Sequence, residues 1–348
     1  MSQPNLSPDL FFETANAYQR SAALKAAVEL GVFTAIGKLS QDGSQGATAE
    51  AVAAQCGASQ RGIRILCDYL TIIGFITKEG QSYSLTPATT MFLNQSSPAY
   101  VGGALRFLNS PMIMQGFNDL TTTVRQGRTT LPAEGSVTPD HPMWVDFARG
   151  MAPLMMMPAQ GMVGLVQGDT AHPLATDRPL KVLDIAAGHG VFGIAFARQF
   201  PNAQITAVDW QNVLQVAQEN AAASGVSDRY HLLPGSAFEV DFGGGYDLIL
   251  ITNFLHHFDV ATNEQLLRKI RAAMAPDGRA LTLEFVPNDD RISPPMAAAF
   301  SLTMLGSTPS GDAYTFAQLE SMFRNAGFSQ SELHTLPPTL IQVVTSYP

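Results

Sequence analysis

The sequence predicts an α/β fold in which a mostly parallel sheet forms the larger part and a mainly helical region precedes it. Three observations lead to this prediction. From residue 181 onward, short apolar strands alternate with helical stretches, which predicts parallel strands joined by right-handed crossovers. Residues 10–73 instead carry apolar residues at helical spacing. The 348 residues are also enough for two domains that each have a core.

Composition excludes several classes of protein. Hydrophobic residues make up 46% of the chain and charged residues 14%, which indicates a compact globular protein. A net charge of −9 argues against nucleic acid and anionic membrane as partners. Cys56 and Cys67 form neither a metal-binding spacing nor a disulfide framework, so we expect no metal site. No secretory signal or membrane-spanning run is recognisable, so we expect a cytoplasmic protein.

The first hundred residues predict a winged helix. After an irregular start over residues 1–8, helical patterns and one polar loop alternate along the chain. Thr48 is placed to cap the helix that follows it. Two short strands around a glycine turn would form the wing. The helices are expected over 10–30, 31–36, 48–55 and 63–73, the polar loop over 40–46, and the wing over 74–85.

A winged helix raises the possibility of DNA binding. Residues 1–100 carry six Lys and Arg against seven Asp and Glu, so they present no positive face to phosphates. The alternative is a folding and dimer-forming module, and the apolar N-terminal helix would be the natural subunit contact. The charge pattern favours the dimer-forming module.

Residues 100–165 are rich in methionine and aromatic residues, and two interpretations stay open. Such stripes are usually core. They can also form a pliable wall for a flat aromatic substrate. Arg149 is the one cation between Trp144 and Leu165, so it needs an anionic partner, either a carboxylate of the cofactor or an internal salt bridge.

A Pro/Thr/Asp-rich linker over residues 169–179 leads into the sheet-forming region. Strand and helix patterns alternate there, and a hairpin broken by Pro337 and Pro338 closes the chain. The strands are expected over 181–185, 204–208, 230–233, 246–251 and 279–285, the helices over 194–200, 213–223, 263–274 and 316–326, and the hairpin strands over 332–336 and 340–344.

The central motif is the stretch 181–193, KVLDIAAGHGVFG, which reads as a strand, a glycine-rich turn and a helix start. That order makes a nucleotide site of the Rossmann kind, and Asp209 follows at the spacing expected for ribose recognition. Gly188-x-Gly190-x-x-Gly193 matches the dinucleotide pattern literally. Asp184, however, would repel a pyrophosphate and would tolerate an amino group or a sulfonium. The acid favours a positively charged cofactor.

Further candidate residues follow the other strands, because ligands bind beyond the carboxyl ends of parallel strands. Asp209 can bind both ribose hydroxyls, and Trp210 can cover an adenine face. Trp210 and Phe238 are as easily explained by core packing. The candidates beyond Asp209 are Trp210 after the second strand, Ser236, Ala237 and Phe238 after the third, and Thr252 and Asn253 after the fourth.

A histidine pair and a glutamate supply the candidate acid–base chemistry. His256 and His257 follow the fourth strand, and adjacent residues point in different directions, so one of them would face the ligand. Glu284 ends the fifth strand, where it can fix the tautomer of that imidazole. A histidine with an orienting carboxylate is a general-base pair. The sequence contains no G-x-S-x-G nucleophile motif and no H-E-x-x-H metal motif.

Several motifs together resemble the cation-independent, S-adenosylmethionine-dependent O-methyltransferases, the bacterial branch of the group that includes plant phenolic and caffeate enzymes. Residues 24–33 and 83–87 resemble the family's winged-helix dimerisation module. Residues 182–190 resemble its cofactor motif and residues 255–258 its catalytic segment. Two further stretches, 311–315 and 325–328, are similar to its late motifs.

The resemblance implies a class I methyltransferase domain with a seven-stranded sheet, S-adenosylmethionine as cofactor and S-adenosylhomocysteine as product. It implies His256 as catalytic base, Glu284 as its partner, Asp209 as ribose ligand and Arg149 as a contact to the methionine carboxylate. The remaining cofactor contacts would come from Asp184, Gly188 and Gly190 together with the residues after the other strands. We expect a homodimer of three-part chains: dimerisation over 1–100, connecting helices that contribute to the substrate pocket over 101–178, and catalysis over 179–348.

Three positions depart from the family pattern. Plant members carry Asp after the catalytic histidine, where this chain has His257, a weaker base candidate. The usual Gly-Asp pair after the third strand is Gly235-Ser236, so a hydroxyl would contact the adenine. Plant members carry a second orienting glutamate in the late motif, where Asp312 is the candidate substitute in this chain.

We therefore predict methyl transfer to a hydroxyl, with a phenol favoured, of an aromatic small molecule of secondary metabolism. The alternatives are a carbon or nitrogen acceptor on the same scaffold, a nicotinamide oxidoreductase, and a winged-helix regulator that senses the cofactor. The regulator would need a basic face, which residues 1–100 lack.

Overall fold

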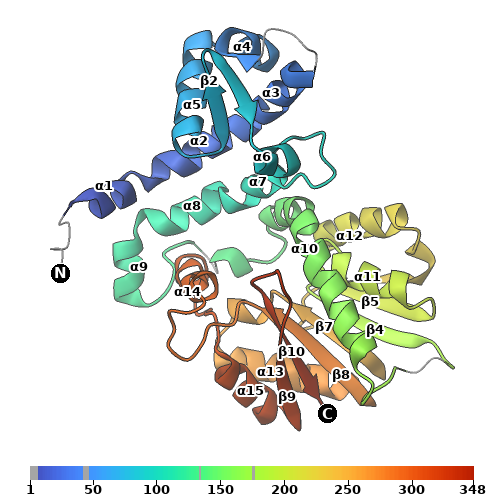
Figure 1. Ribbon diagram of the computed structural model, residues 1–348. Coiled ribbons are helices and arrows are strands. Elements are labelled where there is room, and N and C mark those ends of the chain that lie inside the picture. The colour runs from blue at the N-terminus through green and yellow to red at the C-terminus, as the bar shows by residue number, and fades with distance from the viewer. Residues whose placement is uncertain (1–6, 42–46, 133–134, 175–176) are drawn as a thin grey trace, which may run out of the picture. The chain divides into compact units, whose positions relative to one another are not determined.

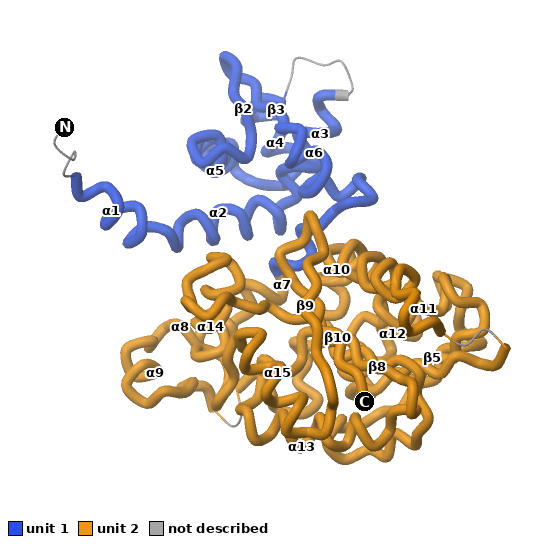
Figure 2. The backbone as a smooth tube through the Cα atoms, turned by 60° about the horizontal axis from the view of Figure 1, so that its bottom comes forward, with its two compact units in different colours: residues 1–105 blue, residues 106–348 orange. Residues whose placement is uncertain are grey.

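The computed structural model describes residues 7–41, 47–132, 135–174 and 177–348. The chain forms two compact units, residues 1–105 and residues 106–348 (Figure 2). Residues 106–178, which the sequence assigns to a connecting segment, lie within the second unit. In the described part of the chain, no helix is long and apolar enough to cross a membrane.

The first unit packs helices around a small antiparallel sheet of order β1-β3-β2. The predicted cap is present, because the Thr48 side chain accepts a hydrogen bond from the Ala51 amide at 3.3 Å. The helical pattern over 10–30 forms two helices that meet at Asn16. Residues 42–46 of the expected polar loop lie outside the described residues. The elements are α1 (Asp9–Ala15), α2 (Ala17–Glu29), α3 (Val32–Gln41), β1 (Ala47–Thr48), α4 (Ala49–Cys56), α5 (Gln60–Ile72), β2 (Ile76–Glu79), β3 (Ser82–Leu85), α6 (Pro87–Phe92) and η1 (Gly102–Ala104).

A helical segment precedes the large sheet. Its longest member, α10, has 26 residues and keeps its helical course through Pro153 and Pro158. The N-terminal half of α10 carries aromatic residues and its C-terminal half carries glycines, a division that matters for the sites below. The elements are α7 (Leu105–Leu108), α8 (Pro111–Asn118), α9 (Leu120–Gln126), η2 (Gly135–Val137) and α10 (Met143–Gly168).

The second unit is built on a seven-stranded sheet of order β6-β5-β4-β7-β8-β10-β9 (Figure 1). Neighbouring strands from β6 to β8 are parallel, and β10 is antiparallel to both β8 and β9. The elements are β4 (Leu180–Ile185), α11 (Val191–Gln199), β5 (Ala203–Asp209), α12 (Gln211–Ala223), η3 (Ser227–Arg229), β6 (Tyr230–Pro234), β7 (Tyr246–Thr252), η4 (Leu255–His257), α13 (Val260–Ala273), β8 (Met274–Glu284), α14 (Pro295–Ser307), α15 (Phe316–Asn325), β9 (Gln330–Thr335) and β10 (Gln342–Tyr347).

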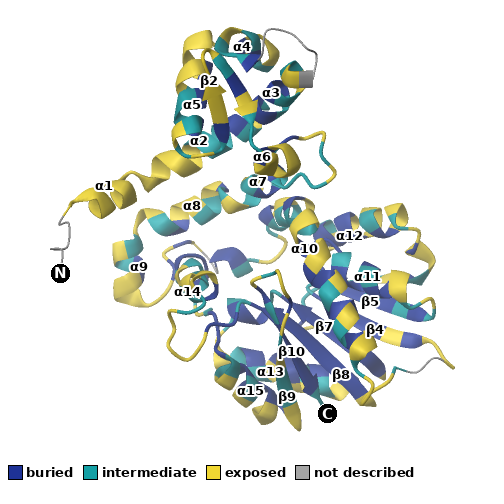
Figure 3. Ribbon diagram, in the orientation of Figure 1, coloured by how far each residue is buried: buried dark blue, intermediate teal, exposed yellow. Residues whose placement is uncertain are grey.

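Helices cover both faces of this sheet, and its central strands are largely buried, whereas the edge strands β6 and β9 are more exposed (Figure 3). Alternate residues point to opposite faces of a strand. Leu248 and Leu250 of β7 pack in the cluster that contains α10, α11 and α12, whereas Ile249 and Ile251 pack in the cluster that contains α13 and α15. This two-sided burial explains why the strands read as continuous apolar runs.

Several predicted elements have different bounds, among them the helix expected over 263–274 and the closing hairpin. The helix expected over 263–274 ends at Ala273, because Met274 already pairs with Tyr246. The register then shifts, and Arg279 pairs with Leu248, so the residues between form an irregularity inside β8. The hairpin is present, but its strands are displaced by about two residues from the prediction.

Candidate active site

The glycine-rich turn between β4 and α11 needs its glycines. Gly188 and Gly190 have φ values of +57° and +74°, in the left-handed region that glycine adopts without strain. A Cβ atom at Gly190 would also lie 2.7 Å from the Tyr230 hydroxyl, inside van der Waals contact. Gly190 is the N-cap residue of α11, so the turn leads directly into the helix.

The amide groups at the start of α11 are largely used by the protein itself. The Gly193 amide donates to the Asp184 carboxylate at 3.0 Å, and the Val191 amide donates to His189 Nδ1 at 3.2 Å. A dinucleotide pyrophosphate is normally bound by such free amides. Here the Gly193 amide is already bonded to a carboxylate, which leaves fewer free donors for a pyrophosphate.

Asp184 is completely buried at the end of β4, and its predicted contact with the cofactor stays a prediction. Burial raises the pKa of its carboxyl to about 8, against the opposing effect of the Gly193 hydrogen bond. Its Oδ1 atom has no hydrogen-bond partner in the described part of the chain. Through its bond to the Gly193 amide, Asp184 holds the start of α11 against the end of β4.

Asp209 ends β5 beside the turn, because β5 pairs in parallel with β4. Its carboxylate accepts hydrogen bonds from the Gly188 amide at 2.8 Å and the Trp210 amide at 2.7 Å. Burial raises the pKa of Asp209 to about 6, although both hydrogen bonds lower it. Asp209 therefore connects two adjacent strands at the carboxyl edge, the position predicted for a ribose ligand.

Some of the other predicted adenine contacts lie in turns at the carboxyl edge of the sheet, and others pack into the hydrophobic core. Trp210 is partly buried and packs against the small cluster of Ala148, Val213 and Val216, in line with the core-packing alternative. Ser236 accepts a hydrogen bond from the Phe238 amide at 3.2 Å within its own turn.

Ala237 is buried, and the Phe238 ring meets the Phe258 ring edge-on at 5.0 Å. Thr252 is buried at the end of β7. Asn253 has a positive φ, and its amide lies 3.7 Å from the Met155 sulfur.

His256 and Glu284 form a buried pair. Parallel pairing of β7 with β8 places the segment after β7 beside the end of β8, and the His256 Nδ1 lies 2.5 Å from Glu284 Oε2. The other carboxylate oxygen accepts from the amides of Phe254, Leu255 and His256 at 3.0, 2.8 and 3.4 Å. Because a carboxylate only accepts hydrogen bonds, Nδ1 carries the proton and Nε2 is left as a proton acceptor.

His257 points in a different direction from His256, as predicted for adjacent residues. Its ring meets the Trp144 indole edge-on at 5.4 Å. Burial, and then the neighbouring His256, lower its pKa well below the usual value. Its Nδ1 is buried and has no hydrogen-bond partner among residues that the structure describes. His257 is thus a neutral imidazole without an orienting carboxylate.

Arg149 on α10 pairs with Glu219 on α12. The Nη1 and Nη2 atoms lie 2.9 and 3.2 Å from the two carboxylate oxygens. More than half of each side chain is exposed. The internal salt bridge, one of the two alternatives left open by the sequence, is therefore formed, and a contact to the cofactor would require Arg149 to exchange partners.

Asp312 does not orient His256. Its carboxylate lies 3.1 Å from Arg291 Nη1, in a pair that is more than one third exposed. The preceding Gly311 is the residue that lies against the catalytic segment, since a Cβ there would come within 2.2 Å of the His256 carbonyl oxygen. The late motif thus contacts the histidine segment through the Gly311 backbone and through the Tyr314 hydroxyl, which donates to the Phe258 carbonyl, and not through the Asp312 carboxylate.

The aromatic residues of α10 belong to the segment 100–165, for which the sequence left core packing and a substrate wall as alternatives. Phe147 stacks on His189 of the glycine-rich turn, with 6.2 Å between the ring centroids, and Trp144 contacts His257. Phe107 packs on both Phe147 and Trp144, at 4.9 and 5.9 Å. These side chains connect the turn to the catalytic segment, whereas Met143, Met155 and Met162 are buried core.

His189 was not predicted as a site residue. It is 3% exposed, and burial lowers its pKa to about 4, so it is neutral at physiological pH. The sequence signal that could have identified His189 is its position between Gly188 and Gly190. A bulky ring inside a glycine-rich turn must pack against a neighbouring element.

Comparisons with known proteins agree with this geometry. The model of the O-methyltransferase dimerisation domain matches residues 12–95, and a methyltransferase domain model matches residues 182–278. The chain is 28% identical over 329 residues to 3-hydroxy-5-methyl-1-naphthoate 3-O-methyltransferase of Streptomyces sahachiroi, covering 93% of this chain and 90% of that one. A crystal structure from Nostoc punctiforme, described as a candidate O-methyltransferase, is 57% identical with a TM-score of 0.92, covering 99% and 100%.

The chain belongs to the S-adenosylmethionine-dependent O-methyltransferases. Human N-acetylserotonin methyltransferase in complex with S-adenosylmethionine has the same fold, with 21% identity, a TM-score of 0.82, and coverage of 100% and 99%. The predicted α/β fold, enzyme class and cofactor are confirmed. The first unit of this O-methyltransferase contains its dimerisation domain.

Proposed function

We propose that this O-methyltransferase methylates a phenolic hydroxyl of an aromatic small molecule, with His256 as general base. The observation that carries the proposal is the buried 2.5 Å contact between His256 Nδ1 and Glu284, which leaves Nε2 as the proton acceptor. Bound S-adenosylmethionine supplies a methyl group that is already activated on a sulfonium.

The chain then has two tasks, to position the acceptor oxygen and to remove its proton. A phenol with a pKa of about 10 is a poor nucleophile at neutral pH. The unprotonated Nε2 of His256 can take the phenol proton while the oxygen–methyl bond forms and the sulfur–methyl bond breaks. Glu284 stabilises the resulting imidazolium. His257, which lacks such a carboxylate, is the weaker base candidate.

We assign the cofactor to the carboxyl edge of β4, β5, β6 and β7. Asp209 would take the ribose hydroxyls, and its carboxylate already lies 2.8 Å from the Gly188 amide at the turn. Arg149 would reach the methionine carboxylate after release from Glu219. The other contacts are proposed from Gly188, Gly190, Trp210, Ser236, Ala237, Phe238, Thr252 and Asn253, and Asp184 would act through the turn.

The aromatic acceptor is proposed from two observations. Trp144, Phe147 and Phe107 form an aromatic wall between the turn and the catalytic histidines. The Streptomyces relative acts on the 3-hydroxyl of a naphthoate, a flat fused ring. We infer an acceptor of the same class, a phenol of secondary metabolism with one or more fused rings.

A methyl-transfer screen with labelled S-adenosylmethionine against phenols, quinones and polyketides tests this assignment. We expect O-methylated phenols as products, and an N- or C-methylated product would overturn the acceptor class. His256→Ala should retain S-adenosylhomocysteine binding and lose most turnover. A variant with near wild-type turnover would instead indicate catalysis by proximity alone.

We also propose a homodimer formed through the first unit, with dimerisation assigned to residues 1–100, the substrate pocket to residues 101–178 and catalysis to residues 179–348. Every residue of α1 is exposed, including Leu10, Phe11 and Phe12 at 76%, 68% and 55%. Contiguous exposed apolar surface is typical of an interface. Light scattering should give a dimer for the wild type and a monomer for Phe11→Asp with Phe12→Asp; a monomeric wild type would contradict the proposal.

A further inference from the structure

A cavity lies between the C-terminal half of α10 and strands β8, β9 and β10. Its volume is about 600 Å³, within the range of small-molecule sites, and α10, β8, β9 and β10 line it. Arg279, in its wall, precedes Glu284 by five residues on β8, which corresponds to about 16 Å along the strand. The end of the cavity that holds Arg279 is therefore distant from Glu284. Thr335 and Leu336 line its other end, where Thr335 pairs with Gln342 and Gln342 pairs with Glu284.

The cavity exists because one side of α10 carries glycines. Gly161, Gly164 and Gly168 all line it, and a helix places such residues on neighbouring positions of one face. A Cβ at Gly161 would contact Leu336 at 3.0 Å, whereas a Cβ at Gly164 or Gly168 would meet open space. The missing side chains leave a volume whose floor is apolar, with Leu165 and Leu281 among its residues.

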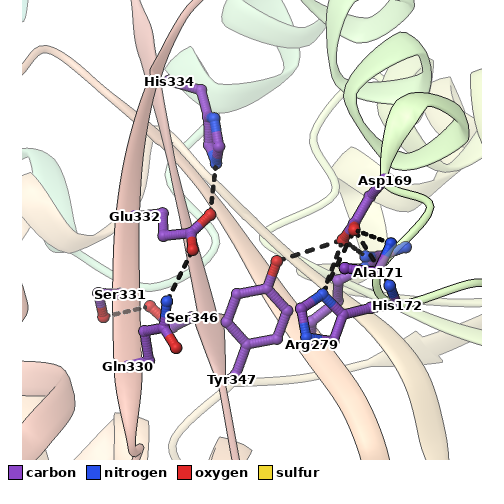
Figure 4. Close-up of polar contacts among 10 residues, drawn as sticks. All are labelled: Asp169, Ala171, His172, Arg279, Gln330, Ser331, Glu332, His334, Ser346 and Tyr347. Atoms are coloured by element: carbon purple, nitrogen blue, oxygen red, sulfur yellow. Dashed lines mark hydrogen bonds and ion pairs between the residues drawn. The ribbon is translucent and has the colours of Figure 1, made fainter.

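A buried arginine in the wall is only partly satisfied. Arg279 is 3% exposed, and its Nη1 donates to the Asp169 carboxylate. Its Nε and Nη2 atoms have no hydrogen-bond partner in the described residues. Asp169 has other donors, from the Tyr347 hydroxyl at 3.2 Å and from the His172 amide and ring at 3.1 and 3.2 Å (Figure 4).

The unpartnered atoms define the chemistry of a ligand. Nε and Nη2 lie along one edge of the planar guanidinium, and two parallel N–H donors on such an edge match the two oxygens of a carboxylate. Both atoms are shielded from solvent, so a ligand reaches them by displacing a wall side chain. The His172 ring, which is half exposed and packs 4.3 Å from the Tyr347 ring, is the wall group beside Asp169 that a ligand would displace.

Charge and shape restrict the ligand further. Asp169 already neutralises Arg279, and Glu332 lies at the rim beside His334 at 3.7 Å. A phosphate dianion would meet more repulsion from these acids than a single carboxylate would. We propose that the cavity binds a small monocarboxylate whose hydrocarbon part fills the space over the glycines and whose carboxylate pairs with the free edge of Arg279.

The experiment uses phenylacetate and its neutral isostere phenylacetamide, titrated into the full-length enzyme by calorimetry with saturating S-adenosylhomocysteine. We expect phenylacetate to bind at least tenfold more tightly than phenylacetamide. Equal affinities, or no binding of either probe at millimolar concentration, would overturn the proposal.

Two variants locate the binding. Gly164→Leu fills the open space and should abolish phenylacetate binding, whereas Gly164→Ala is the matched control and should retain it; both changes favour the helix. Arg279→Lys keeps the ion pair with Asp169 but lacks the two-donor edge, so it should weaken phenylacetate binding at least tenfold. Unchanged affinity in Gly164→Leu would place the probe elsewhere and refute the site, whatever the fate of the methyl-transfer proposal.

Discussion

Replacing Glu284 by glutamine is the sharpest test of the proposed base, because the change preserves shape and inverts one hydrogen bond. In the wild type one oxygen accepts from three backbone amides and the other from His256 Nδ1. A glutamine has a single oxygen, and the three amides will hold it. Its NH2 group then faces Nδ1 and donates to it, which moves the imidazole proton to Nε2. The base is lost while His256 remains in place.

General acid–base catalysis contributes about 10²–10⁴ in rate, so kcat of Glu284→Gln should fall by about that factor at pH 7. This corresponds to about 3–5 kcal/mol of transition-state stabilisation. Affinity for S-adenosylhomocysteine should not change, because Glu284 is assigned no cofactor contact. Loss of the charge-assisted bonds should also lower the free energy of unfolding by about 1–3 kcal/mol.

The assay is the pH dependence of kcat with a phenolic acceptor. Near pH 10 the phenol ionises without a base, so the deficit of Glu284→Gln should shrink there. Glu320→Gln, which removes an exposed pair with Arg324, is the control and should behave as wild type. If kcat of Glu284→Gln stays within threefold of the wild type at pH 7, the tautomer argument is wrong.

Three more predictions concern the cofactor edge. Asp209→Ala should weaken S-adenosylhomocysteine binding at least tenfold in calorimetry, and an unchanged affinity would remove the ribose role. Asp184 has a folded-state pKa raised to about 8 by burial, so its contribution to stability is complete below about pH 4 and is lost as pH rises through 8. The melting temperature of the enzyme without cofactor should therefore fall between pH 5 and 8, and Asp184→Asn should reduce this pH dependence. The same pH dependence in the wild type and in Asp184→Asn would contradict the burial argument. Gly311→Ala places a Cβ 2.2 Å from the His256 carbonyl oxygen and should reduce kcat at least tenfold, with unchanged kcat disproving the contact.

The sequence predicted those parts of the fold whose signal is local. Alternation of apolar strands with helices located the parallel sheet, and Thr48 marked the start of α4 through its capping hydrogen bond. Bounds failed where pairing overrides local preference. Met274 looks like the end of a helix, but its partner Tyr246 on another strand makes it the start of β8.

The same distinction applies to the candidate site. His256 and Glu284 were predictable because parallel strands bring their carboxyl ends to one edge. The partners of Arg149 and Asp184 were not, because helix packing sets the first and the path of the turn sets the second. A charged residue in a sequence shows that a partner is needed and leaves open which of several distant groups provides it.

Asp184 shows how one buried carboxyl can decide between nucleotides without contacting either. Its bond to the Gly193 amide occupies the donor that a pyrophosphate would use at the start of α11. Its charge is unfavourable in this position, as its raised pKa indicates, so the protein retains it at a cost in stability. The literal dinucleotide pattern of glycines therefore carries less information than the acid four residues before it. In this O-methyltransferase, the Asp184 carboxyl uses one amide at the start of α11, and we infer that the residues after the neighbouring strands determine what binds.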